Sequence, residues 1–274
     1  MSRRRSGRPR HRGVTRFAAL IVGLAAVLLP TQIGSAGTVP GGPKPTVVLV
    51  HGAFADASGW NDVTEQLQHD GYTVIAPANP ERGLISDSAY LSSILHTIDG
   101  PIVLVGHSYG GAVITNAANG HPNVKALVYI AAFAPDLAET VGGLVLKNPG
   151  SGLTLENLVL RPYPVGVDAY ISPRVFHDVF AADLPAETAA VMAASQRPAN
   201  LVILAEPSGL PAWRTIPSWY MVASNDKTIP PATERYMAER AGATTVEVAS
   251  SHVAMMSHPD AVANLIVSAA NTAH

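Results

Sequence analysis

The chain has 274 residues, 47% of them hydrophobic, which is enough for one substantial core. Its first 36 residues hold seven arginines and no acid. Removing those seven from the 18 basic residues leaves 11 against all 20 acidic ones, a net charge near −9. Because such a chain lacks the basic surface that phosphates require, we expect no nucleic-acid partner. Cysteine is absent, which excludes disulfides, thiolate metal sites and a cysteine nucleophile.

The amino terminus has the pattern of a secretory signal. Arginines crowd residues 3–16, an apolar run covers 17–29, and small residues follow up to Ala36. The run of 13 residues is shorter than the about 20 that span a bilayer. We therefore expect a signal peptide over 1–36, cleaved near Ala36, and a secreted protein in the extracellular or periplasmic/cell-wall space. An uncleaved membrane anchor is the alternative; once the signal is cleaved, we expect no stable membrane association.

Residues 37–45 are rich in glycine and proline and are interpreted as a flexible leader. From residue 46 on, short apolar segments alternate with helix-compatible ones. The apolar segments are rich in branched residues, as strands of a buried parallel sheet are, and cover 46–50, 73–76, 102–105, 126–130, 219–223 and 245–248. Helices are expected near 58–69, 86–98, 109–118, 231–241 and 259–270. This order predicts an α/β fold: an open, doubly wound, mostly parallel sheet with helices on both faces.

The alternation stops between residues 135 and 216, where prolines and glycines separate weakly amphipathic pieces. Ligands of open α/β sheets bind at the carboxyl edge of the strands. We therefore interpret 135–216 as a cap inserted over that edge, which leaves 46–134 and 217–274 as the core. A second independent domain is the alternative.

A nucleophile elbow is predicted at Gly106-His107-Ser108-Tyr109-Gly110. The pentapeptide follows a predicted strand and precedes a predicted helix, and its glycines permit the sharp turn that exposes a serine. Ser108 is therefore the candidate nucleophile, and an ordinary glycine-rich turn is the alternative.

A serine nucleophile needs a base, and the base needs an acid to orient it. In such sheets the chain order is serine, acid, histidine. Asp226 and His252 follow the fifth and sixth predicted strands and fit this order. Asp226 as a mere turn former, Asp136 as the acid and His258 as the base are the competing interpretations.

A tetrahedral intermediate requires two backbone N–H donors. Tyr109, directly after the nucleophile, is the first candidate. Ala53 is the second, because Gly52 lets the loop after the first strand bend toward the site, and Phe54 is next in line. We expect Phe54 and Trp60 to contact substrate. Further candidates for the pocket wall are Leu153, Phe176 and Trp213.

Three segments carry a family resemblance: Val48-Leu49-Val50-His51-Gly52-Ala53, Gly106-His107-Ser108-Tyr109-Gly110-Gly111 and Ser251-His252-Val253-Ala254-Met255-Met256-Ser257-His258-Pro259. With them the chain resembles the α/β-hydrolase superfamily, in the branch of bacterial carboxylesterases related to plant methylesterases and hydroxynitrile lyases. The resemblance covers most of 46–271 and is weakest in the cap. It implies Ser108 as nucleophile, His252 as base and Asp226 as acid, with the amides of Ala53 and Tyr109 as the oxyanion hole.

Two departures from that family matter. Val253 stands where the plant lyases carry a lysine that stabilises cyanide, which disfavours cyanogenesis. The core also starts at what resembles the third strand of the family, so about six strands are expected.

The sequence thus predicts a secreted serine hydrolase that cleaves small carboxylic esters through an acyl-enzyme. A small-ligand receptor with little or no turnover and a hydroxynitrile-lyase or perhydrolase activity are the alternatives. No metal and no organic cofactor are expected, because neither ligand spacing nor a phosphate-binding glycine loop is present.

Overall fold

The computed structural model describes residues 44–273. The predicted signal peptide 1–36, its cleavage near Ala36 and most of the leader 37–45 lie outside the described residues. Within the described part, no helix combines the length and the hydropathy that crossing a bilayer requires.

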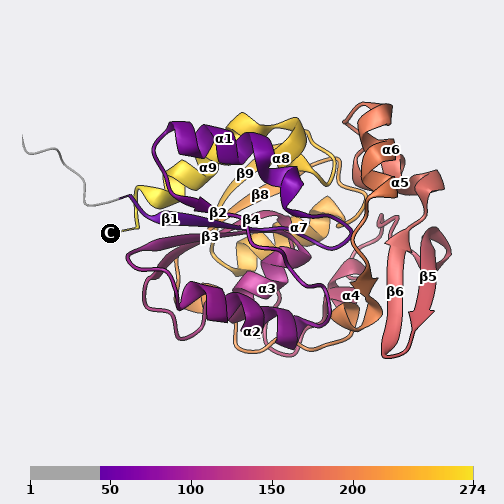
Figure 1. Ribbon diagram of the computed structural model, residues 1–274, viewed down its shortest axis with the longest axis horizontal. Helices are drawn as coiled ribbons and strands as arrows, with labels where there is room; N and C mark the ends of the chain where they lie inside the picture. The colour runs from indigo at the N-terminus through magenta and orange to yellow at the C-terminus, as the bar shows by residue number, and fades with distance from the viewer. Residues whose placement is uncertain (1–43, 274) are drawn as a thin grey trace, which may run out of the picture. The chain divides into compact units, whose positions relative to one another are not determined.

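The centre of the molecule is a six-stranded sheet in which every pair of neighbouring strands is parallel (Figure 1). Its spatial order is β2-β1-β3-β4-β8-β9. The strands are β1 Thr46–Val50, β2 Val74–Ile75, β3 Ile102–Ser108, β4 Val124–Ala132, β8 Ser218–Ala223 and β9 Thr244–Val248. This order confirms the predicted open α/β sheet of about six strands.

Helices cover both faces of this sheet (Figure 1). On one face α1 Asn61–His69 packs beside α9 Pro259–Ala270, and on the other α2 Leu84–Leu95 packs beside α3 Tyr109–Ala117. The remaining core elements are the 3-10 helix η1 Ala57–Trp60, α7 Pro231–Arg240 and α8 Ala254–Ser257. Strands β3 and β8 are buried along their whole length, as their branched apolar sequences predict.

Residues 135–216, called the cap below, lie between β4 and β8. They contain a three-stranded antiparallel sheet formed by β5 Leu158–Tyr163, β6 Gly166–Ile171 and β7 Ala199–Asn200. The helices of the cap are α4 Val141–Val145, η2 Leu155–Asn157, α5 Pro173–Phe180, α6 Ala186–Ala194, η3 Leu201–Leu204 and η4 Ala212–Arg214. The sequence did not predict this sheet, because β5 is half exposed and has no continuous apolar run. The cap lies at one end of the core (Figure 1).

Because all six core strands run in the same direction, their carboxyl ends meet at one edge of the sheet. The loops that follow β1, β3, β8 and β9 therefore converge there. Those loops carry Ala53, Ser108, Asp226 and His252.

Candidate active site

Ser108 occupies the turn between β3 and α3 in a strained backbone conformation. Its φ is 52° and its ψ is −125°, a combination that residues with a side chain rarely adopt. The turn depends on glycine because α3 passes very close to β1. A Cβ at Gly110 would lie 2.4 Å from the carbonyl oxygen of Val50. This tight packing holds Ser108, which is 4% exposed, at the carboxyl edge of the sheet.

The acid and the histidine are in direct contact at the same edge. Nδ1 of His252 lies 2.6 Å from Oδ2 of Asp226, and both side chains are fully buried. The other carboxylate oxygen accepts the amides of Thr228 and Ile229 at 2.6 and 3.0 Å. These bonds fix the carboxylate, so Nδ1 of His252 donates to it and Nε2 is left as the basic nitrogen. Within residues 44–273, Nε2 has no hydrogen-bond partner.

Two further rings hold His252 in place. Nε2 of His107 donates to the carbonyl oxygen of His252 at 2.9 Å, and the two imidazole centroids are 4.7 Å apart. Burial lowers the pKa of His107 well below its usual value, so this ring stays neutral beside the base. From the cap, Phe180 on α5 packs edge-on against His252 with centroids 5.0 Å apart. The sequence offered no signal for Phe180, because its contact depends on how the cap is placed.

A second buried carboxyl group lies beside Asp226 and was not foreseen from the sequence. Glu234 on α7 is fully buried, and its Oε2 accepts the amide of Ala223 at 3.0 Å. Burial, and next the charge of Asp226, raise the pKa of Glu234 well above its usual value, so this group is a neutral acid. The available signal was a glutamate in the first turn of the helix that follows the Asp226 loop.

The competing acid and base lie elsewhere. Asp136 forms an ion pair with Arg214 at 2.6 Å on the surface. His258 precedes α9, and its Nδ1 lies 2.9 Å from the hydroxyl of Ser257. Of the four candidates, the structure brings together Asp226 and His252.

The two predicted oxyanion donors, Ala53 and Tyr109, differ from Phe54 in whether the backbone amide already has a hydrogen-bond partner. Tyr109 is the first residue of α3, where an amide has no partner within the helix. The amide of Phe54 is occupied, because it donates to Oε2 of Glu81 at 3.2 Å. In the described part of the chain, the amide of Ala53 donates to no other group. Among residues 44–273, Ala53 and Tyr109 are therefore the predicted donors whose amides remain free.

A small cavity opens beside Ser108. Its wall combines core and cap residues, namely Ala53, Phe54, Ser108, Tyr109, Phe133, Val141, Leu153, Ala169, Ala199, Asn200, Leu201, Ile203, Leu204 and Thr228. The polar side chains of Asn200 and Thr228 are engaged within the protein, the first with Tyr163 at 2.6 Å and the second with Val179 at 2.9 Å. The wall is therefore apolar except at Ser108, and it has no charged residue.

Of the residues expected in the pocket wall, Phe54 and Leu153 line the cavity. Trp60, Phe176 and Trp213 do not. Trp60 is fully buried and packs edge-on to His107, so its contact with substrate stays a prediction that this cavity does not support. Phe176 packs on Phe180 inside the cap, and the indole nitrogen of Trp213 donates to the carbonyl oxygen of Pro135. From the sequence alone, apolar residues of the cavity wall could not be distinguished from apolar residues of the core.

Chemically, the site combines a strained serine, a buried histidine oriented by a carboxylate, and free amides beside the serine. No group of histidine or acidic residues among 44–273 is arranged to hold a metal ion.

Comparison with known proteins agrees with the α/β fold. Residues 47–265 match the Alpha/beta hydrolase family. Carbendazim hydrolyzing esterase of Nocardioides sp. (strain SG-4G) is 31% identical over 113 residues, which is 36% of this chain and 47% of that protein. This match thus spans about half the length of that relative. Pyrethroid hydrolase of Sphingobium wenxiniae is 28% identical over 246 residues, covering 80% of this chain and 85% of that protein.

Among solved structures, polyneuridine aldehyde esterase superposes with a TM-score of 0.71 at 21% identity. The superposition covers 82% of this chain and 99% of that one. At this identity the likeness concerns the fold.

Proposed function

The chain belongs to the alpha/beta hydrolase family, and its relatives include ester-cleaving hydrolases; we propose that it cleaves small carboxylic esters through an acyl-enzyme on Ser108. The observation that carries the proposal is the buried 2.6 Å contact between His252 and Asp226, at the same sheet edge as the strained Ser108. The candidate nucleophile, base and orienting acid thus lie at the carboxyl ends of strands in one sheet.

In the proposed mechanism, Nε2 of His252 takes the proton of the Ser108 hydroxyl while the oxygen attacks the ester carbonyl carbon. The carbonyl oxygen becomes an oxyanion that accepts the amides of Ala53 and Tyr109. As the intermediate collapses, the bond to the alcohol breaks and His252 gives its proton to the departing oxygen. Water then attacks the acyl-enzyme with His252 as base again, which releases the carboxylic acid and restores Ser108. Asp226 stabilises the imidazolium in both halves.

The cavity indicates the kind of ester. An apolar wall without a free polar side chain favours uncharged acyl and alcohol groups, because a buried charge without a partner is strongly unfavourable. The cavity beside Ser108 is also small, which favours small acyl groups. We therefore propose small aryl or alkyl esters as substrates.

The test is a panel of 4-nitrophenyl and alkyl esters of graded chain length, assayed on residues 37–274. We expect hydrolysis of the short, uncharged members. Ser108→Ala is expected to lower kcat by at least about 10³-fold, because the nucleophile is lost while the amides remain. Ser93→Ala, at an exposed serine on α2, is the matched control with unchanged activity. Full activity of Ser108→Ala would contradict the proposal, and tight binding of esters without turnover would favour a receptor.

We also propose that the protein is secreted after cleavage near Ala36. The arginine-rich start, the apolar run and the small residues before Gly37 support this. The intact mass of the protein from the culture medium distinguishes a chain starting near Gly37 from one that still starts at Met1.

A further inference from the structure

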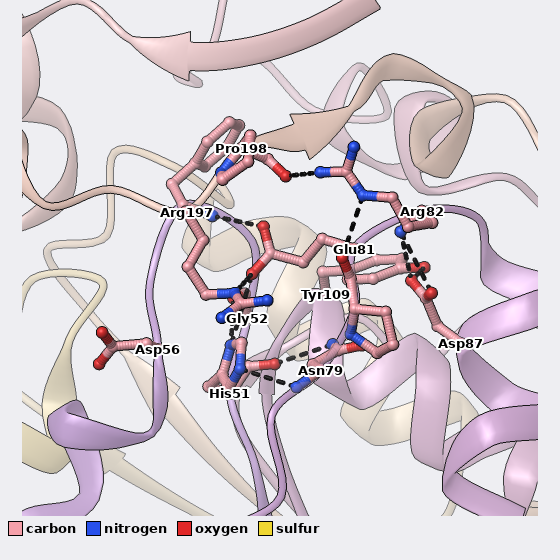
Figure 2. A network of polar contacts seen from close by, with 12 residues as sticks. His51, Gly52, Asp56, Asn79, Glu81, Arg82, Asp87, Tyr109, Arg197 and Pro198 are labelled. Carbon is pink, nitrogen blue, oxygen red and sulfur yellow. Dashed lines mark hydrogen bonds and ion pairs between the residues drawn. The ribbon is translucent and has the colours of Figure 1, made fainter. Parts of the chain in front are cut away.

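Glu81 is a buried carboxyl group that the proposed mechanism does not use. It lies in the loop between β2 and α2, its side chain is fully buried, and its φ of 59° is in the left-handed region. Its Oε2 accepts the amide of Phe54, which also has a left-handed φ of 64°. Figure 2 shows Glu81 at the centre of a polar network that includes His51 and Arg197. Glu81 thus supports Phe54, a second strained residue, at the end of the oxyanion loop, residues 51–54.

The nearest histidine does not neutralise Glu81. Nδ1 of His51 lies 3.5 Å from Oε1 of Glu81, but it lies closer, at 2.9 Å, to the carbonyl oxygen of Gly52. Nε2 of His51 accepts the amide of Asn79 at 2.9 Å, which fixes the neutral tautomer. Burial lowers the pKa of His51, and burial raises the pKa of Glu81 to about 9. Both groups are therefore neutral at pH 7, and the contact between them is not an ion pair.

The cap reaches Glu81 from the other side. Nε of Arg197 lies 3.7 Å from Oε1 of Glu81, and neither atom has a hydrogen-bond partner in the described part of the chain. The backbones are joined as well, because the amide of Asn200 donates to the carbonyl oxygen of Glu81 at 3.0 Å. In addition, the Arg82 guanidinium donates to the carbonyl oxygen of Pro198. The β2–α2 loop therefore connects the cap to the oxyanion loop.

The first turn of α2, which follows this loop, also reaches the elbow. Asp87 accepts the amide of Arg82 at 3.1 Å and the hydroxyl of Tyr109 at 2.8 Å (Figure 2). Tyr109 carries the other proposed oxyanion donor. Both donors are thus supported from one short segment, residues 81–87.

We propose that Glu81 is a positioning residue of the oxyanion hole: its carboxyl group engages the amide of Phe54, which leaves Ala53 as the free donor, and links this loop to Arg197 of the cap. The inference rests on the proposed function, since it assigns the geometry of that same site. Glu81 acts through Phe54 and does not contact the reacting atoms.

The test compares Glu81→Gln with Glu81→Leu on the full mature chain. Glutamine keeps an acceptor for the Phe54 amide and cannot ionise, whereas leucine leaves that amide unpaired. Loss of a whole oxyanion donor lowers turnover by about 10² to 10³, so misplacing one is expected to lower kcat about 10- to 100-fold in Glu81→Leu. KM is expected to change by less than about threefold, and Glu81→Gln is expected to stay within about threefold of wild type in both constants.

A transition-state mimic separates positioning from general damage to the fold. A trifluoromethyl ketone forms a tetrahedral adduct with a serine, so its inhibition constant is expected to rise in parallel with KM/kcat across the variants. Asp168→Asn is the matched control. Asp168 pairs with Arg82 at 2.8 Å and ties the same β2–α2 loop to the cap without touching residues 51–54. This control is expected to keep the wild-type kcat.

Arg197 supplies a coupling test. If Arg197 acts through Glu81, Arg197→Met lowers kcat less than Glu81→Leu does, and the double variant is no worse than Glu81→Leu alone. Fully additive effects would overturn the link to the cap.

The pH profile gives a further readout. Ionisation of Glu81 as pH rises through about 9 places a negative charge beside the oxyanion site, which opposes formation of the oxyanion. We expect kcat/KM to fall above that pH in wild type and to persist in Glu81→Gln. The other charged or titratable groups facing Glu81 are His51, Arg82, Asp87, Tyr109 and Arg197. These remain in both proteins, so identical profiles would contradict the assignment.

The outcomes of these experiments show whether the positioning role of Glu81 fails or the proposed ester hydrolysis fails. Equal kcat in Glu81→Leu and wild type, or equal damage in Glu81→Leu and Glu81→Gln, overturns the positioning role while ester hydrolysis stands. If the wild-type protein hydrolyses no ester, the proposed function fails, and hydrogen exchange of the Phe54 amide decides the inference. That exchange is expected to be at least tenfold faster in Glu81→Leu than in wild type, and unchanged exchange overturns the inference.

Discussion

At the scale of single residues, Asp226 differs from the other acids in the groups that its carboxylate accepts. It receives two backbone amides and Nδ1 of His252, and a neutral Glu234 lies beside it. Asp136 instead pairs with Arg214 on the surface. The orientation of the imidazole therefore depends on Asp226.

We expect Asp226→Asn to lower kcat about 10³- to 10⁴-fold, because an amide facing Nδ1 favours the wrong tautomer of His252. Asp136→Asn is expected to change kcat less than about threefold, as a surface ion pair contributes little. Ester hydrolysis by the two purified variants, each checked for folding by circular dichroism, measures this. The opposite ranking would assign the orienting acid to Asp136.

The sequence left these two acids as competitors, although it placed both after predicted strands. Strand order decides between them, because β9, the strand before the His252 loop, pairs with β8 and not with β4. The order of the strands in the sheet cannot be inferred from the local sequence around either acid. Glu81 and Glu234 were missed for a related reason: a charged residue in a loop or on a helix is normally exposed, and only the packing of distant segments buries these two.

At the scale of elements, the site depends on how closely α3 packs against β1. Gly110 permits the approach, since an added Cβ would lie 2.4 Å from the carbonyl oxygen of Val50 and 2.8 Å from that of His51. Both contacts are with backbone, which cannot rotate away.

We therefore expect Gly110→Ala to lower the free energy of unfolding by about 3 kcal/mol, the upper range for overpacking, and to lower kcat by displacing Ser108. Gly59→Ala is the control, because its Cβ would meet only flexible methionine side chains, Met255 at 3.4 Å and Met256 at 3.8 Å. It is expected to change stability by less than about 1 kcal/mol. Urea denaturation measures the free energy of unfolding of both variants. Equal values would show that the close approach of α3 to β1 does not exclude a side chain at residue 110.

The core elements were predictable from their sequences and the cap sheet was not. Segments such as 102–105 and 219–223 are continuous apolar runs because both faces of a central parallel strand are buried. Strand β3 nevertheless continues to Ser108, beyond the polar His107, because its neighbours extend the pairing. β5 and β6 form a hairpin with a partly exposed face, and their sequences show neither continuous burial nor strict alternation.

At the scale of the whole molecule, the cap completes the site in three ways. It contributes Leu153 and Leu204 to the cavity wall, Phe180 to the packing of His252, and Arg197 to the surroundings of Glu81. The family match and the sheet topology agree on the α/β core, whereas these three contributions come from residues 135–216. Substrate preference is therefore expected to follow the cap.

The central claim, that Ser108 is activated as a nucleophile by His252 and Asp226, is tested most directly by covalent capture. The mature protein is incubated with a fluorophosphonate at neutral pH and analysed by intact mass and peptide mapping. The account predicts a single adduct on Ser108, formed at a rate that falls sharply in His252→Ala and Asp226→Asn. No adduct on the wild-type protein, or an adduct on Ser108 that forms at the same rate without His252, would contradict it.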